Sequence, residues 1–255
     1  MKLKTLLSTL LAAALTLACS GNTANYAVTV VDGVEGSIVY LGDMLSGDEI
    51  DQATVTDGIA EFSGTADKDA LLAVQADGSE WQTLFFADGK PVTVSLADNS
   101  LTGSKLNEKL NAYDKEAGDI YENALRAIAE FGDLSQEGQE AATVAIQAEI
   151  DKVQDYYKQI LYENPDNIIP AAFMPTIAQI LEREELEEAF SGKHKYAKHP
   201  YALQMKESMD EYYARLDEME AAKDNFIGTK FIDLQEPDVN GKMHSLSEYV
   251  GCGQW

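Results

Sequence analysis

The chain has 255 residues, with 44 Asp and Glu residues against 19 Lys and Arg residues and a formal net charge of −25. Nucleic acids and anionic lipid surfaces are therefore poor partners, because both would be repelled by so acidic a protein. Hydrophobic residues make up 45% of the chain, which is enough to bury the cores of one or two domains. The two cysteines exclude a framework of several disulfides.

The first 18 residues have the pattern of a secretory signal peptide. Lys2 and Lys4 precede an apolar run from Leu6 to Leu17, and the small residue Ala18 comes before Cys19. The run is too short for a helix that spans a bilayer. The sequence therefore predicts an exported protein with a signal peptide over residues 1–18.

Cys19 is the predicted site of lipidation. Thr16-Leu17-Ala18-Cys19 resembles a lipobox, although Thr16 stands where Leu is usual. Residues 19–24 are mostly polar and suit a flexible tether. We therefore expect a membrane-anchored lipoprotein of the Gram-negative envelope that faces the periplasm. An ordinary signal peptide followed by an incidental cysteine is the alternative.

Residues 25–103 are predicted to form an antiparallel β-sandwich or barrel. Short runs of alternating apolar and polar residues are separated by regularly spaced Asp-Gly turns, which is typical of such domains. The expected strands cover residues 26–30, 37–41, 50–56, 59–62, 71–75, 81–86 and 92–96. The turns are Asp32-Gly33, Asp57-Gly58, Asp77-Gly78 and Asp88-Gly89.

Residues 104–224 are predicted to be helical. Apolar residues from Leu106 to Phe131 recur every three or four positions, which indicates one buried helix face. A second such face runs from Ile146 to Ile160, so the two helices are expected to form an antiparallel hairpin. A third helix begins near Asn167, and a short one covers residues 184–190. In the last helix, heptad spacing predicts a core face made of Met205, Met209, Tyr212, Leu216 and Met219.

Residues 225–255 carry a family resemblance. The stretches Gly228-x-x-Phe231, Pro237-Asp238, Asn240-Gly241-Lys242 and Leu246-Ser247-Glu248-Tyr249-x-Gly251 look like the opening of a thioredoxin-fold domain. The nearest resemblance is to membrane-anchored thiol-disulfide oxidoreductases of the TlpA/ResA type, which are kin to the peroxiredoxins. Asn240-Gly241 predicts a hairpin turn.

The resemblance implies that a buried strand and a W-C-x-x-C motif come next in the family. Residues 225–255 are accordingly expected to be the truncated start of a thioredoxin-like domain. The preceding β and helical parts resemble an extension of unknown function that many envelope lipoproteins of this family carry. The expected fold class is α+β.

The residues offer little for catalysis or metal binding. His194, His199 and His244 are not spaced as a metal site requires, and no nucleophile motif or phosphate-binding loop is present. A catalytic carboxylate pair cannot be located among so many acidic residues. Cys252 is expected to be a free thiol, and one thiol cannot both attack a disulfide and resolve the mixed disulfide. We expect no catalytic residue, cofactor or metal ligand.

The leading hypothesis is a redox-inactive envelope lipoprotein of the thiol-disulfide oxidoreductase family that keeps the non-catalytic extension. The alternative is a complete module that binds a partner protein or a small envelope ligand. The expected partners are the membrane, through a lipid on Cys19, and an envelope protein, but not nucleic acid. No sequence motif supports a third hypothesis, that of a hydrolase.

Overall fold

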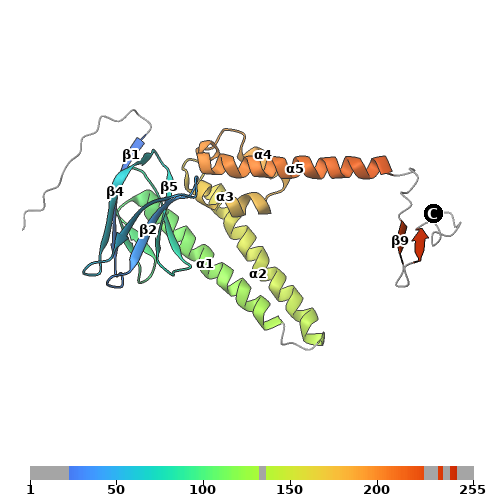
Figure 1. Cartoon of the computed structure of the whole chain (residues 1–255), viewed down its shortest axis with the longest axis horizontal. Coiled ribbons are helices and arrows are strands. Elements are labelled where there is room, and N and C mark those ends of the chain that lie inside the picture. The colour runs from blue at the N-terminus through green and yellow to red at the C-terminus, as the bar shows by residue number, and fades with distance from the viewer. Residues whose placement is uncertain (1–22, 132–135, 227–234, 238–241, 246–255) are drawn as a thin grey trace, which may run out of the picture. The chain divides into compact units, whose positions relative to one another are not determined.

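The computed structural model describes residues 23–131, 136–226, 235–237 and 242–245 (Figure 1). It divides into two compact units, Met1–Lys206 and Glu207–Trp255. The first unit contains a β-sandwich followed by helices.

The sandwich consists of two four-stranded sheets, with strand orders β4-β1-β7-β8 and β3-β2-β5-β6. The α+β fold class is confirmed, and the described strands form no closed barrel. All seven expected strands are present, and the short strand β8 was missed. The pairing of β1 with β7 is parallel, which departs from the expected antiparallel arrangement. The strands are β1 (Thr23–Val31), β2 (Ile38–Asp43), β3 (Glu49–Thr54), β4 (Ala60–Asp67), β5 (Leu71–Ala76), β6 (Gln82–Phe86), β7 (Val92–Ser95) and β8 (Ser100–Thr102).

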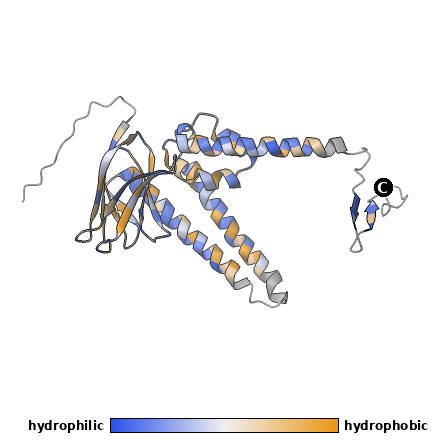
Figure 2. Cartoon of the chain, in the orientation of Figure 1, coloured by the Kyte–Doolittle hydropathy of each residue, from blue (hydrophilic) through white to orange (hydrophobic). Residues whose placement is uncertain are grey.

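The core lies between the two sheets. Strand alternation sends every second side chain inward, so Val30 and Val94 of one sheet face Val39, Leu41 and Leu72 of the other, and all five are fully buried. In Figure 2, hydrophobic segments, in orange, are visible on the strands of the sandwich. Burial of this apolar surface is the main force that holds the sheets together.

Asp57-Gly58 carries the chain from β3 in one sheet to β4 in the other. Both residues have positive φ, 53° and 77°, as a type I′ turn requires. Thr56 and Ile59 pair across the turn. The expected turn at Asp57-Gly58 is therefore confirmed, but the strands on either side of it belong to different sheets.

Five helices and one 3-10 turn follow the sandwich among the described residues. α1 and α2 lie side by side, and residues along their contact such as Ala117, Ala124 and Ile160 are buried (Figure 1). The expected helical hairpin is thus present. The elements are α1 (Lys105–Phe131), α2 (Gln136–Glu163), α3 (Ile169–Ile180), α4 (Arg183–Ala189), η1 (Tyr196–Lys198) and α5 (Pro200–Phe226).

Two buried asparagines attach α1 to the sandwich. The Asn107 carboxamide accepts a hydrogen bond from the backbone N–H of Phe86 (2.7 Å) and donates one to its carbonyl oxygen (2.9 Å). One turn later, Asn111 accepts from the N–H of Leu101 (3.0 Å) and donates to the carbonyl oxygen of Asn99 (2.9 Å). Each side chain therefore pairs with the edge of a sheet as a neighbouring strand would.

A third buried asparagine joins α2 to α1. Asn164, just after α2, accepts hydrogen bonds from the ammonium of Lys109 (2.7 Å) and the amide of Asn167 (2.9 Å). Its own amide donates to the Tyr113 hydroxyl (3.1 Å) and to the carbonyl oxygen of Ile160 (2.8 Å). These contacts fix the end of α2 against α1.

His199 brings the chain back to the sandwich. Its ring is buried, and the N–H of Tyr201 donates to Nδ1 (3.2 Å), so the ring proton is on Nε2. Nε2 donates to the carbonyl oxygen of Asp69, between β4 and β5 (2.8 Å), and Phe86 packs edge-on against the ring. Burial lowers the pKa of His199, which favours the neutral ring that these contacts need.

The second unit contains most of α5 and one pair of short strands. β9 (Gln235–Pro237) and β10 (Met243–Ser245) are antiparallel, as the tail pattern predicts, while the turn at Asn240-Gly241 lies outside the described residues. None of the described helices combines the length and the apolar content that a membrane span requires.

The expected core face on α5 is wrong. Tyr212, Leu216 and Met219 are 46%, 40% and 60% exposed, respectively. Beyond α5 itself, the described part of this unit offers only β9 and β10, which are three residues each. Heptad spacing shows that apolar residues share a face, but burial also needs an element that packs on that face.

We predict that Asn107→Ala destabilises the protein by about 2–4 kcal/mol, because it leaves two buried backbone groups of Phe86 without partners. The control Asn123→Ala changes an exposed residue of the same helix and should alter the free energy of unfolding by less than about 0.5 kcal/mol. Chemical denaturation of both variants measures this difference. Equal effects would contradict the role assigned to Asn107.

Candidate functional site

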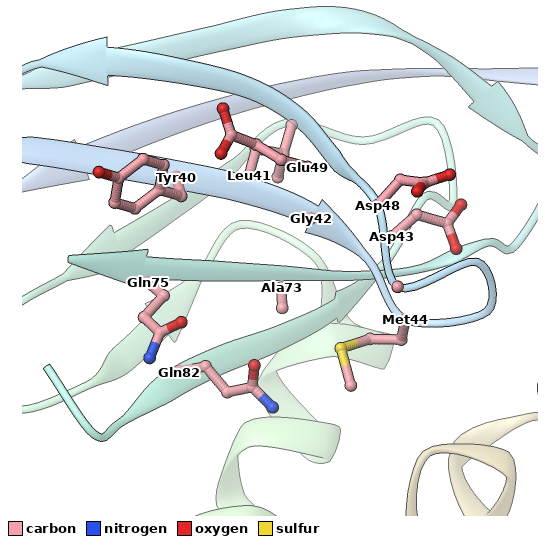
Figure 3. Close-up of a pocket in the computed structure, with 11 residues that line it drawn as sticks. Tyr40, Leu41, Gly42, Asp43, Met44, Asp48, Glu49, Ala73, Gln75 and Gln82 are labelled. Carbon is pink, nitrogen blue, oxygen red and sulfur yellow. The ribbon is translucent and has the colours of Figure 1, made fainter. Parts of the chain in front are cut away.

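A hollow lies on the outer face of the sheet β3-β2-β5-β6 (Figure 3). On β2, Leu41 points into the core while Tyr40 and Gly42 face outward. The register places Gly42 opposite Ala73 of β5 and Tyr40 opposite Gln75. Two small residues side by side leave a depression of about 340 Å³.

The turn between β2 and β3 forms one wall of the hollow. The Asp43 carboxylate accepts hydrogen bonds from the N–H groups of Leu45 (2.7 Å) and Ser46 (3.2 Å). The N–H of Gly47, at a φ of 75°, donates to the carbonyl oxygen of Asp43 (2.9 Å). The register of β2 against β3 also shifts at this end, as at a β-bulge, and such irregularities re-aim side chains beside binding sites.

The hollow combines an apolar floor with polar groups around it. In Figure 3, Met44 from the turn and Gln82 from β6 lie on either side of the space next to Ala73. The amide of Gln75 donates to the carbonyl oxygen of Ser79 (2.6 Å), which holds that side chain in place. The remaining polar lining comes from the Tyr40 hydroxyl and from the carboxylates of Asp43, Asp48 and Glu49.

This set of groups suits binding better than covalent chemistry. Amides, a hydroxyl and carboxylates can orient a small polar or cationic ligand, and the volume is near the low end for ligand pockets. The lining contains no Ser, Cys, His or Lys that could act as a nucleophile or base. Among the described residues, no group of three or more His, Cys, Asp and Glu side chains is placed to hold a metal ion.

A smaller cleft of about 220 Å³ shares Gln82 with the hollow and reaches α1. Trp81, 66% exposed, lies at the edge of this cleft, and Asp114 and Asp119 of α1 line it. Burial raises the pKa of the Asp114 carboxyl above its ordinary value. Carboxyl groups with a raised pKa in clefts are often functional, and Lys115 and Glu122 also line this cleft.

The two predicted site residues, Cys19 and Cys252, lie outside the described residues. Of the three histidines considered as metal ligands, His199 is engaged with Asp69 and Tyr201, and His194 stacks on Tyr196 with ring centroids 5.2 Å apart. Neither arrangement is a metal site.

Sequence reasoning missed the hollow because strand register decides which residues meet. The alternation in residues 37–41 shows that Tyr40 faces outward. No signal in the sequence shows that Gly42 meets Ala73, or that Gln75 meets Gln82 on the next strand. A glycine at an outward position of a strand was the one available hint.

We predict that Asp114→Asn raises the free energy of unfolding at neutral pH. A carboxyl whose pKa is raised in the folded state opposes folding when it is ionised, so the gain should shrink as the pH falls towards the ordinary pKa of Asp, near 4. Denaturation at pH 7 and at pH 4 measures the change.

The matched control for this prediction is Asp119→Asn, which alters an exposed carboxylate in the same cleft. It should leave the stability nearly unchanged at both pH values. A loss of stability in Asp114→Asn at pH 7 would show that the ionised carboxylate is needed where it lies.

Part of the first unit matches the model of a known protein family. A family model described as "Domain of unknown function (DUF4369)" matches residues 27–110, which cover nearly the whole sandwich and the first turns of α1. No curated protein matches the chain. Residues 27–110, which include the hollow, are thus similar to a domain family whose function its own description leaves open.

Proposed function

We propose that this protein is an envelope lipoprotein related to thioredoxin-like thiol-disulfide oxidoreductases. In this proposal Cys19 carries the lipid, and the sandwich and helices form a non-catalytic module. The module positions or binds a partner in the envelope and performs no redox step of its own.

The family match over residues 27–110 is the observation that carries this proposal. Domains of this family occur in some proteins associated with thiol-disulfide oxidoreductases. The tail stretches from Gly228 to Gly251 add the resemblance to the opening of a thioredoxin-like domain. The antiparallel pair β9–β10 is compatible with that opening.

A second proposal is favoured by the hollow. The sandwich itself would bind a small envelope ligand, whatever the tail contributes. The hollow joins a floor of Gly42 and Ala73 to surrounding polar residues, of which Gln75 is already held by a hydrogen bond. The carboxylates at its rim favour a neutral or cationic ligand over an anion.

We predict that Cys19→Ala moves the protein from the membrane fraction to the soluble envelope fraction, because the substitution removes the atom that would be acylated. The matched control, Cys252→Ala, removes the other cysteine and should leave the protein in the membrane fraction. Cell fractionation with detection of the protein gives the answer. A Cys19→Ala variant that stays with the membrane would exclude the lipid anchor.

We also predict that the full chain with Cys19→Ala does not catalyse the reduction of insulin disulfides. Cys252 can form one mixed disulfide, but no second thiol of the chain can release it. The rate should therefore equal that of the reductant alone. Multiple turnovers that disappear when Cys252→Ser is added would contradict a non-catalytic role.

A further inference from the structure

A pocket lined by lysines lies where the chain returns to the sandwich. One wall is the segment Asp67–Asp69 at the end of β4, and the other is the segment Lys193–Pro200 before and at the start of α5. The volume between them is about 470 Å³. The hydrogen bond from His199 to Asp69 holds the two walls together. All these residues belong to the first unit, and none of them lines the hollow.

The pocket reverses the sign of charge that prevails in the protein. Four ammonium groups line it, against the carboxylates of Asp67 and Asp69. The net charge of the whole chain, in contrast, is −25. The four lysines are Lys68, Lys193, Lys195 and Lys198.

These four side chains have no counter-ion within the described part of the chain. None of them is within 4 Å of a carboxylate there, and none makes a side-chain hydrogen bond. Other lysines are paired: Lys115 contacts Asp98, Lys152 contacts Glu149 and Lys158 contacts Glu185. The pocket thus gathers four lysines that make no direct ion pair within the described part of the chain, against two carboxylates in its lining.

The backbone that carries Lys195 and Lys198 is held in place. The N–H of Lys195 donates to the carbonyl oxygen of Pro165 (3.4 Å), and the N–H of Lys198 donates to that of Lys195 (3.2 Å) in the turn η1. Tyr196, between them, is 2% exposed and stacks on His194. The lysines therefore project from a fixed frame, which reduces the ordering that a ligand would have to impose.

We propose that this pocket binds a small anion that carries phosphate groups. Lysine binds phosphate as a point charge, and several lysines around one pocket match the multiple charges of a diphosphate. The pocket contains no arginine, whose planar group is the better partner for a single carboxylate. A bound anion would also relieve the mutual repulsion of the lysines. This site is independent of the proposed function.

The test uses the full chain with Cys19→Ala and inorganic pyrophosphate as the probe, measured by isothermal titration calorimetry. We expect binding of one pyrophosphate, with an affinity that falls as salt is raised. The combined variant Lys193→Gln, Lys195→Gln and Lys198→Gln should weaken binding by about 30-fold or more, because three charge-assisted contacts are lost.

The matched control removes the same charge elsewhere, through Lys90→Gln, Lys115→Gln and Lys152→Gln, which are exposed residues in surface ion pairs. It should change the affinity by less than about threefold, since exposed pairs contribute little. Both variants should keep the thermal stability of the parent. Equal weakening in the two variants would mean diffuse attraction and would overturn the site.

Two further binding measurements distinguish a lipid headgroup from a free phosphate as the ligand. Vesicles of phosphatidylcholine with and without phosphatidylglycerol test a lipid headgroup, and lysine-dependent binding to the charged vesicles alone would assign the site to that headgroup. Absence of binding to both pyrophosphate and charged vesicles would overturn the proposal. So would self-association that the lysine variant abolishes, because an acidic surface of a second copy would then occupy the pocket.

Discussion

The end of a β-sandwich that meets a helix presents backbone groups that can reach neither water nor another strand. A buried N–H or C=O without a partner costs as much as several favourable contacts contribute, so this edge must be satisfied. Asn107 and Asn111 do so with one donor and one acceptor each. Phe86 belongs to β6 of one sheet, and Leu101 belongs to β8 of the other. One face of α1 therefore satisfies the backbone groups at an edge of both sheets. In a closed barrel, further strands would pair with these groups instead.

The other contacts depend on that placement of α1. The hydrogen bonds among Lys109, Asn164 and Tyr113 hold the end of α2 against α1, which the sandwich already holds in place. The largely buried helix α3 comes next in the chain. The chain then returns to the sandwich at His199, and the lysine pocket forms at that return. The hollow on the outer sheet face is formed by the strands and by the turn between β2 and β3. The hollow and the lysine pocket are thus recessed surfaces of opposite electrostatic character, one made by the sheet and one made where the chain folds back from the helices.

Local patterns carried the prediction of the elements. Alternation and Asp-Gly turns located seven strands, and apolar periodicity located α1 and α2, because both signals come from residues near in sequence. The parallel pairing of β1 with β7, the meeting of Gly42 with Ala73 and the role of Asn107 all depend on residues that are distant in sequence. Nothing in a window around Asn107 distinguishes it from the exposed Asn123. The heptad pattern on α5 gave a wrong prediction of a buried face for the same reason. It shows which residues share a helix face, but not whether another element packs on that face.

The hydrogen bonds of Asn107 and Asn111 to the two sheets also limit how the domain can be transferred between genes. The sandwich uses α1 as its last edge, so a gene fragment that stopped after β8 would encode a domain with open backbone groups at the ends of both sheets. The region matched by the domain family runs through Asn107 and ends at residue 110, one position before Asn111. A sandwich of this kind that is moved between genes should therefore travel with the first two turns of the helix. Deletions and fusions should be joined after Asn111, because the smallest exchangeable unit is the sandwich together with the start of α1.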